Sequence, residues 1–516
     1  MIGAAVTWAI PTDDFDRVAI PNPHFLDPRL GANRNAFFHR PFAGIPSGAE
    51  LSARVLELLS LSFGLVTTAC TVLLARALIP GRPLVWTASG VLVAGLPAFD
   101  FLSVSVTNDS LVIALSSVTL LLLVLWLKHR KEHFGWSAAI ALALALLTKV
   151  NAIGLIAPYC VTVFKAEASW VKRLVFLSGL AGLLILLDGW WIFHMLSTFG
   201  DVTGVFWLKK NFPDGIQPVF SVPLGVSLAN AAHEFPHLIA TVFINFNTDS
   251  PWSRDVPAFV LVIGLVAGFL RAFQTRQVKR SRLALPLLAW VLVMFLEVSY
   301  WLTMYDAPGR LIYPALTPAA ILAAAGWQWL FDMLRLRGAL IVSIALVASA
   351  SSTAWLVTAP KYRYPPRVPE LPLTAQPAHV VFDDAVELIG FESSNQTFPA
   401  EGGTASLTLY WRLVHPIDIA LNTFVHIDSL DPSYSADASY DGAVGGGTYP
   451  PNFWKAGEVV VDRYKFHLSA NQELDNINMT PLAVHVGMYE APPTGGILHV
   501  KTEPPDATDV GAEITH

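Results

Sequence analysis

The chain has 516 residues, of which 53% are hydrophobic and only 14% are charged, and its mean hydropathy is +0.51. Soluble proteins carry about 25% charged residues, so this composition excludes a disordered protein, a coiled coil and a nucleic-acid-binding domain. The apolar composition therefore predicts an integral membrane protein. The net charge of −6 is unevenly distributed, because residues 360–516 hold 8 Lys and Arg against 20 Asp and Glu. This asymmetry predicts a second, acidic part of the chain.

Residues 1–50 are expected to form a loop region on the outer face of the membrane, as the remnant of a first outer loop. The opening ten residues are too short to span a bilayer, and they lack the basic start and the small-residue cleavage site of a signal peptide. They are typical of the end of a helix whose beginning is absent, so we expect an N-terminal truncation.

Residues 51–359 are predicted to form a polytopic helical membrane domain, because a spanning helix needs about 20 mostly apolar residues. Two short runs flank the polar residues Lys149 and Asn151 and could be one bent helix or two short ones; we count two, since only that number agrees with the charges. The resulting ten segments are 55–78, 84–101, 109–127, 135–148, 152–165, 174–196, 256–273, 283–304, 311–331 and 338–358.

Basic residues are concentrated in alternate loops of this ten-span arrangement, and Lys and Arg mark cytoplasmic loops because they resist translocation. The opposite short loops hold only Lys149 and Arg310. This places residues 1–50, the loop 197–255 and everything after 360 on the outer face. The basic loops contain Arg76 and Arg82; Lys128, Arg130 and Lys131; Lys165, Lys172 and Arg173; Arg271, Arg276, Lys279, Arg280 and Arg282; and Arg335 and Arg337.

Residues 360–377 contain six prolines, which predict a stiff extended linker. From residue 378 to 516 the apolar residues alternate with a period of two, at 405–413, 422–427, 458–468 and 482–489, with Gly- and Pro-rich turns between them. This pattern predicts an all-β antiparallel sandwich. It is either a structural domain or a carbohydrate-binding one with a face built on Tyr449, Trp454 or Tyr489.

Ionisable side chains at the ends of the spans are the candidate functional residues, because they are costly to keep in a membrane. Lys149 and Arg310 suit a lipid-linked phosphate. Asp109, Asp201 and Glu297 could orient an acceptor or a divalent metal. The alternative for Asp109 is to cap the helix that begins near residue 110, and the alternative for Arg310 is to pair with Asp306.

Two further motifs are not assigned a function. Residues 233–237 read His-Glu-Phe-Pro-His and match the zinc-protease signature H-E-x-x-H, but Pro236 interrupts the helical turn that this chemistry requires. The three glycines at 445–447 have no adjacent lysine or helix start, so they predict a turn and not a phosphate-binding loop.

The order of several short motifs resembles that of bacterial membrane glycosyltransferases of the GT-C superfamily, relatives of protein O-mannosyltransferases and aminoarabinose transferases. The similarity covers nearly the whole chain. The matching stretches are 21–25 (Pro-Asn-Pro-His-Phe), 33–35 (Asn-Arg-Asn), 38–39 (Phe-His), 105–109 (Ser-Val-Thr-Asn-Asp), 147–149 (Leu-Thr-Lys), 190–191 (Trp-Trp), 200–201 (Gly-Asp) and 309–314 (Gly-Arg-Leu-Ile-Tyr-Pro), and in the sandwich 407–411, 424–426 and 454–458.

This resemblance implies transfer of a sugar from a polyprenyl-phosphate donor to a glycan, lipid or protein acceptor, at the outer face of the bacterial cytoplasmic membrane. It implies supporting roles for Asn108, His194 and Tyr313. The family's acidic residue early in the first outer loop is absent, since Asp13, Asp14 and Asp16 come too late in that loop. Relatives also tend to have Arg-Asn where this chain has His194-Met195.

Two functions therefore follow from the sequence. The first is a membrane glycosyltransferase in which Asp109, Lys149, Asp201 and Arg310 share one water-facing hollow. The second is a non-catalytic membrane protein that displays a glycan- or wall-binding sandwich. No nucleic acid is expected as a partner.

Overall fold

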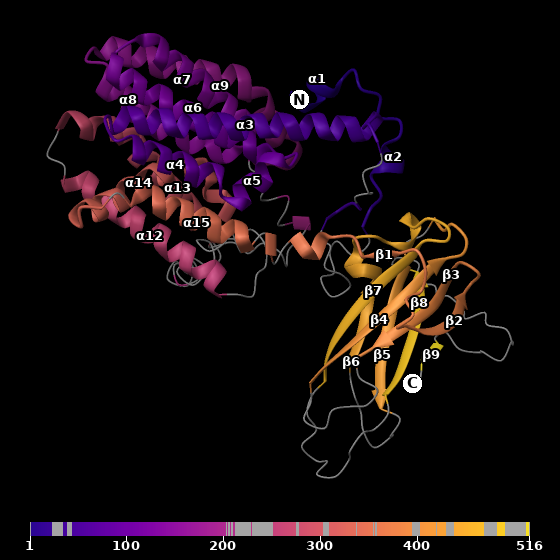
Figure 1. Ribbon diagram of the computed structural model, residues 1–516. Coiled ribbons are helices and arrows are strands. Elements are labelled where there is room, and N and C mark those ends of the chain that lie inside the picture. Colours follow the sequence, from indigo (N-terminus) through magenta and orange to yellow (C-terminus); the bar gives the residue numbers. More distant parts are fainter. Residues whose placement is uncertain are drawn as a thin grey trace. The chain divides into compact units, whose positions relative to one another are not determined.

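The computed structural model describes two compact units, Met1–Ile10 with Leu51–Thr358 and Pro11–Glu50 with Ala359–His516 (Figure 1). We call them the helical unit and the β unit. The described residues are 2–22, 35–38, 44–202, 204, 207, 210–211, 229, 251–274, 278–302, 309–336, 338–353, 355–356, 359–394, 403–418, 421–429, 438–468, 482–490 and 512–514.

The helical unit is built mainly from apolar helices. Its α-helices are α1 (Ile2–Thr7), α3 (Gly48–Leu78), α4 (Pro83–Ala94), α5 (Pro97–Val104), α6 (Asn108–His129), α7 (Glu132–Thr148), α8 (Ile156–Ala166), α9 (Trp170–Phe199), α12 (Pro251–Gln274), α13 (Val278–Leu302), α14 (Leu316–Met333) and α15 (Ala339–Thr353). Two 3-10 helices, η1 (Val150–Leu155) and η3 (Gly309–Ala315), precede α8 and α14.

Each of the ten predicted apolar segments overlaps a described helix, and the chain is a multi-pass membrane protein. The predicted number of ten spans is not confirmed, because four described helices are long and apolar enough to cross a bilayer, or five if a bent pair forms one span. That pair is α4 and α5, which meet at an angle of 60°. The bend falls where Pro97 begins a new helix, because proline cannot continue the preceding one.

Helices α12 and α14 approach each other through glycine. An ideal Cβ on Gly326 would overlap with the backbone O of Gly264 and the backbone N of Gly268, so the two helices touch without side chains between them. Gly264 and Gly268 are spaced as in the small-residue motif that allows close helix packing in membranes. Beside this contact, Trp327 Nε1 donates to the carbonyl of Val260 at 3.1 Å.

A buried hydroxyl network joins three helices of this unit. Thr317 Oγ1 lies 2.8 Å from both Thr71 Oγ1 and Ser117 Oγ, which connects α14 to α3 and α6. Each hydroxyl thereby finds a partner away from water, where an unpaired polar group is costly.

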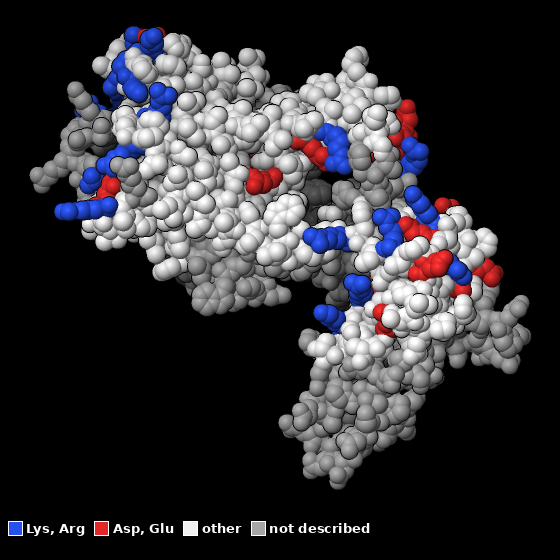
Figure 2. All heavy atoms as spheres, in the orientation of Figure 1, with Lys and Arg blue, Asp and Glu red and all other residues white. Residues whose placement is uncertain are grey.

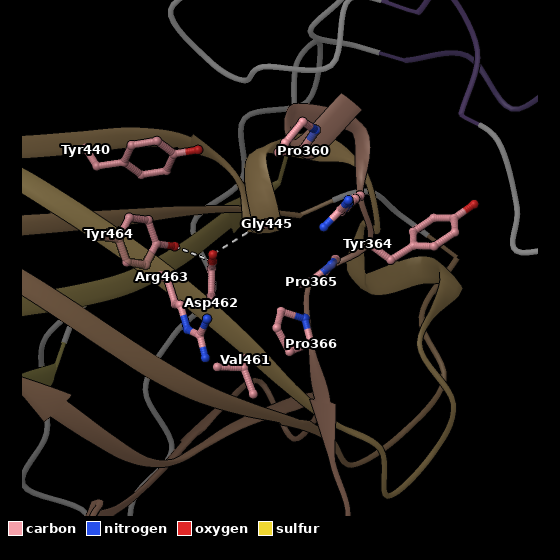
Figure 3. Close-up of a pocket in the computed structure, with 11 residues that line it drawn as sticks. Pro360, Tyr364, Pro365, Pro366, Tyr440, Gly445, Val461, Asp462, Arg463 and Tyr464 are labelled. Atoms are coloured by element: carbon pink, nitrogen blue, oxygen red, sulfur yellow. Dashed lines mark hydrogen bonds between the residues drawn. The ribbon is translucent and has the colours of Figure 1, made fainter. Parts of the chain in front are cut away.

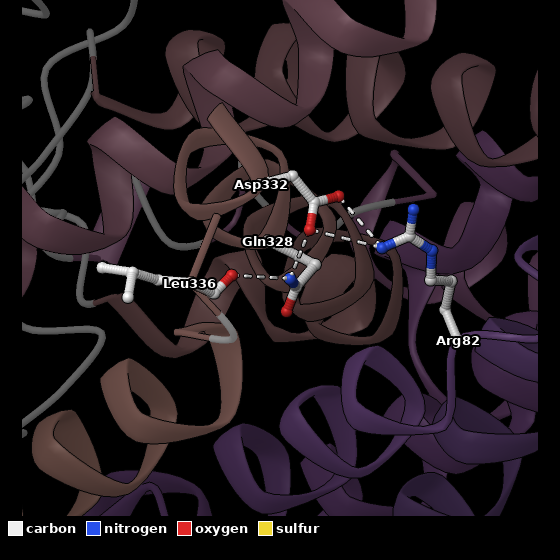
Figure 4. Close-up of polar contacts among 4 residues, drawn as sticks. All are labelled: Arg82, Gln328, Asp332 and Leu336. Atoms are coloured by element: carbon white, nitrogen blue, oxygen red, sulfur yellow. Dashed lines mark hydrogen bonds and ion pairs between the residues drawn. The ribbon is translucent and has the colours of Figure 1, made fainter. Parts of the chain in front are cut away.

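Lys and Arg side chains gather at one end of the helical unit, where α6 and α8 end and α7 and α9 begin (Figure 2). Two ion pairs join helix termini at this end: Lys172 with Glu132 at 2.5 Å, and Arg82 with Asp332 at 3.0 Å. Figure 4 shows Asp332 also accepting from Gln328 Nε2 at 2.8 Å. We call this end, with its basic connections, the basic end.

The β unit contains two antiparallel sheets, as the alternating pattern predicts. The larger has the strand order β1-β7-β4-β3-β2 and the smaller β6-β5-β8-β9. The strands are β1 (Arg367–Val368), β2 (Gln376–Phe382), β3 (Val386–Ser393), β4 (Gly403–Leu413), β5 (Leu421–Ser429), β6 (Ala438–Ala443), β7 (Val459–Leu468), β8 (Leu482–Glu490) and β9 (Ala512–Ile514), and the short helices of the unit are α2 (Phe15–Val18), η5 (Ala359–Tyr362), η6 (Val444–Gly447) and η7 (Pro451–Phe453).

Apolar residues from both sheets share one core, which includes Trp411 of β4, Val425 of β5 and Met488 of β8. Tyr449 and Trp454 also belong to this core, with 1% and 6% of their surface exposed. A carbohydrate-binding face built on these two rings is therefore wrong: Trp454 Nε1 donates to Tyr449 O at 2.9 Å, and the Tyr449 hydroxyl donates to Glu458 at 2.7 Å.

The Pro-rich segment and the glycine triplet are both part of the folded β unit. Residues 360–377, expected to be a linker, include β1, which is the edge strand of the larger sheet. The glycines at 445–447 form the 3-10 turn η6, in which Gly445 and Gly447 have φ of 59° and 80°. Glycine adopts this left-handed backbone without the steric cost that other residues have.

A pH dependence of stability follows from Asp462 on β7. Burial raises the pKa of its carboxyl to about 6, against about 3.9 in an unfolded chain. Between these values the folded state keeps a proton that the unfolded state has lost. The protonated carboxyl therefore contributes roughly 3 kcal/mol to the free energy of unfolding at low pH, and this contribution is lost as the pH rises from about 4 through 6. Asp462→Asn should flatten this change when unfolding in urea is followed by pulse proteolysis. Asp418→Asn, at an exposed site, should keep the wild-type slope, and a slope unaltered by Asp462→Asn would contradict the assignment.

Candidate functional site

The start of α6 and the end of α7 meet at the end of these helices away from the basic end. Thr107 Oγ1 caps α6 by accepting from the backbone N–H of Asp109 at 3.3 Å. Asp109, in the first turn, accepts from Lys149 Nζ at 2.5 Å. The neighbouring Asn108 Nδ2 donates to Thr148 O at 3.3 Å. Thr107 is therefore the cap, and the predicted capping role of Asp109 is replaced by an ion pair.

This ion pair is partly withdrawn from solvent. The side chain of Asp109 is 9% exposed and that of Lys149 is 25% exposed. A carboxylate in the first turn is also favoured by the positive end of the helix dipole. The pair therefore fixes one ammonium group, with further N–H donors, at the surface of a membrane helix.

The 3-10 helix η1 follows Lys149 directly and packs against α13. An ideal Cβ on Gly154 would lie 2.9 Å from Trp290 and 3.7 Å from Glu297 Oε2. This places the half-buried Glu297 beside the turn that begins with Lys149. Asn151 is buried in the same turn, and its Oδ1 has no hydrogen-bond partner among the described residues.

The second 3-10 helix, η3, carries Arg310 and Tyr313. Trp290 Nε1 donates to Pro314 O of η3 at 2.8 Å. The ring of the same tryptophan lies against Gly154 of η1. Tyr313 is buried and packs edge-to-face on Phe99, with ring centroids 6.2 Å apart. Arg310 is exposed and has no carboxylate partner within the described part of the chain; Asp306 lies outside it.

The end of α9 holds the other two candidates. His194 is exposed, and its ring contacts Trp191 and Phe199 of its own helix. Asp201 is 8% exposed and follows Gly200, whose φ of 78° ends the helix. The structure thus joins Asp109 to Lys149 and places Glu297 beside η1, whereas the described contacts of His194 remain within α9.

The early acidic residues of the chain differ in their surroundings. Asp13 and Asp16 are exposed, whereas Asp14 Oδ1 accepts from Ala49 N at 2.8 Å at the start of α3 and pairs with Arg17 at 3.6 Å. Asp14 therefore serves a helix terminus. The H-E-x-x-H stretch at 233–237 lies outside the described residues.

Sequence reasoning missed the contribution of Trp290, which joins the two 3-10 helices. No periodicity marks it, although a tryptophan indole in a membrane span needs a partner for its N–H, and that requirement is a signal. Among the described residues there is no group of three or more His, Cys, Asp or Glu side chains that could hold a metal ion. The described candidates supply the ammonium of Lys149, the guanidinium of Arg310 and the carboxylates of Asp109 and Glu297.

The ion pair should contribute measurably to the stability of the protein. Lys149→Met leaves the buried Asp109 charge unpaired and should lower the free energy of unfolding by about 3 kcal/mol, whereas Lys149→Met with Asp109→Asn should recover most of that loss. Thermal unfolding in detergent measures the stability of the wild type, both single variants and the double variant, which together form a double-mutant cycle. The exposed pair Arg54–Glu57 is the control, with an expected effect of about 0.5 kcal/mol for Glu57→Gln. Equal losses in the single and double variants would show that the two charges are not coupled.

No family model and no curated protein matches this chain. Among solved structures, it is similar to ArnT from Cupriavidus metallidurans in the apo state, with 19% identity and a TM-score of 0.39 over 60% of this chain and 51% of that one. The form bound to undecaprenyl phosphate matches with 20% identity and a TM-score of 0.38, over 60% and 52%. The oligosaccharyltransferase of Archaeoglobus fulgidus matches with 14% identity and a TM-score of 0.32, over 70% and 54%. The chain spans about half the length of each of these proteins.

Proposed function

We propose that the helical unit transfers a sugar from a polyprenyl-phosphate donor to an acceptor. The observation that carries the proposal is the Asp109–Lys149 pair, at the end of α6 and α7 opposite the basic end. The family-like motifs at 105–109, 147–149 and 309–314 supply three of the elements around it. An ordered ammonium group at the end of two membrane helices suits a lipid phosphate better than a soluble anion.

The orientation follows from the charges. Basic connections face the cytoplasm, and α6 ends in Lys128 on that side after beginning with Asn108 and Asp109. We therefore infer that the ion pair lies towards the outer face of a bacterial cytoplasmic membrane. The β unit would be on the same outer side.

In the transfer, an acceptor oxygen attacks the anomeric carbon, and the bond from that carbon to the phosphate oxygen breaks. The lipid phosphate leaves with the electron pair. Lys149 and Arg310 stabilise the negative charge that develops on it, and Asp109 holds the ammonium of Lys149 in place. Asp109 is thus a positioning residue, and Glu297, beside η1, is the candidate that accepts the acceptor's proton.

The test is cleavage of the donor. Membranes that contain the chain should release polyprenyl phosphate from an undecaprenyl-phosphate sugar, and membranes that lack it should not. Undecaprenyl phosphate is the lipid in one of the similar structures and is the suitable carrier. Donor that stays intact with every sugar and acceptor tried would favour the second function, a membrane protein that presents a glycan-binding β unit.

A further inference from the structure

Asn151, in the turn η1, carries a buried acceptor atom that the described part of the chain leaves unused. The residue is 9% exposed, and its Oδ1 has no hydrogen-bond partner among the described residues. A buried acceptor without a donor destabilises the folded chain, because it has lost its contact with water and gained no replacement. A donor supplied from outside the chain, by a ligand, would explain why an amide stands at this position.

The buried carboxylate of Asp462 in the β unit shows the more common arrangement. Figure 3 shows it accepting from the Tyr464 hydroxyl and from the Gly445 N–H, the latter at 3.1 Å. These donors come from its own strand, β7, and from the turn η6, so the fold itself supplies them. No described residue does the same for Asn151 Oδ1.

Asn151 lies on the face of η1 that packs against α13. A 3-10 helix has three residues per turn, so side chains at i and i+3 lie above one another, and Asn151 shares its face with Gly154. An ideal Cβ on Gly154 would lie 2.5 Å from Val293 and 3.7 Å from Glu297 Oε2. Ile153, on another face of the turn, is 53% exposed. The buried amide is therefore on the side of the turn that faces α13, where Glu297 lies.

The same amide is close in the chain to the proposed phosphate site. Asn151 follows Lys149 by two residues, and the Ala152 N–H donates to Lys149 O at 3.0 Å, which closes the first turn of η1. In a polyprenyl-phosphate donor the sugar is joined directly to the phosphate. A ligand whose phosphate binds the Lys149 ammonium therefore brings its sugar hydroxyls close to this turn.

We propose that Asn151 Oδ1 accepts a hydrogen bond from a hydroxyl of the donor sugar. Since this role presupposes a polyprenyl-phosphate donor, it rests on the proposed function and adds to it the residue that recognises the sugar. A site built to bond a hydroxyl discriminates against a ligand that lacks it, because the buried acceptor is then left unpaired. Asn151 thus strengthens binding of the lipid that carries a sugar and contributes nothing to binding of the bare lipid phosphate that remains after transfer.

The test compares lipids with and without a sugar, titrated onto the purified full chain in detergent and followed by native mass spectrometry. The probes are undecaprenyl phosphate that carries glucose or mannose, and bare undecaprenyl phosphate. Asn151→Leu and Asn151→Ala should each weaken binding of the sugar-bearing lipid about tenfold, and neither should alter binding of the bare lipid. Ile153→Ala changes the exposed face of the same turn and should leave binding of all three lipids unchanged.

Thermal unfolding without ligand gives a second readout that separates recognition from a structural role. Asn151→Leu should raise the midpoint of unfolding, because leucine has a similar size and removes the unpaired acceptor. A lower midpoint would show that the amide is paired within the protein and would overturn the inference.

Three binding results would also overturn the role of Asn151. They are no binding of either sugar-bearing lipid by the wild type, undiminished binding of these lipids by both variants, or equal weakening of the bare lipid. Failure of the proposed function is a separate result, since it would appear as donor that the wild type binds and does not cleave. In that case the binding of the two Asn151 variants still decides whether the amide recognises the sugar.

Discussion

Lys149→Ala is expected to lower the rate of sugar transfer by roughly a hundred-fold or more, because it removes the cation that stabilises the departing lipid phosphate. The ammonium is held by Asp109 at 2.5 Å, and the one Lys or Arg within α6 and α7, Lys128, lies at the opposite end of α6. Donor cleavage in proteoliposomes at saturating donor measures the effect. Arg310→Ala should lower the rate in the same direction.

Lys165→Ala is the matched control, since Lys165 is an exposed lysine in the last turn of α8 at the basic end. It should cleave the donor at the wild-type rate. The double variant Lys149→Met with Asp109→Asn separates function from folding, because it should regain stability and remain inactive. Full activity in that double variant would remove Lys149 from the mechanism.

Gly326→Ala should be strongly destabilising, by about 3 kcal/mol, even though it adds only one methyl group. That group would overlap with backbone atoms of Gly264 and Gly268, and backbone cannot rotate away as a flexible side chain can. Helices α12 and α14 would have to separate, which loses packing along their whole contact. The midpoint of thermal unfolding in detergent measures the change.

Gly182→Ala provides the comparison within the same membrane unit. Gly182 lies inside α9, and nothing approaches within 4 Å of the place its Cβ would occupy. Alanine has the higher helix propensity, so this variant should be as stable as the wild type or more stable by up to about 1 kcal/mol. Similar destabilisation by both variants would mean that the α12–α14 contact is not closely packed.

The helices and strands could be predicted because length and periodicity determine them locally. Each of the ten predicted apolar runs overlaps a described helix, and alternation identified β4, β5, β7 and β8. The number of spans could not be obtained in this way, because α7 and α8 are apolar but short. A short apolar helix of one composition can cross the bilayer, enter it part of the way, or lie among the other helices.

The contacts of the site depended on tertiary packing, which a single sequence does not specify. Asp109 and Lys149 were both candidates from their positions at helix ends, but their pairing joins residues 40 positions apart. Trp454 could not be assigned to the core or to a carbohydrate-binding face from the sequence, because only its burial distinguishes the two. The Gly264–Gly268 spacing was present in the sequence, and only the position of Gly326 shows its partner.

The most direct measurement is a structure of the full chain in a lipid nanodisc with undecaprenyl phosphate. We expect phosphate density within hydrogen-bonding distance of Lys149 Nζ, on the side of η1 and η3. Phosphate bound only at the basic end, or density absent from the Asp109–Lys149 pair at saturating lipid, would contradict it.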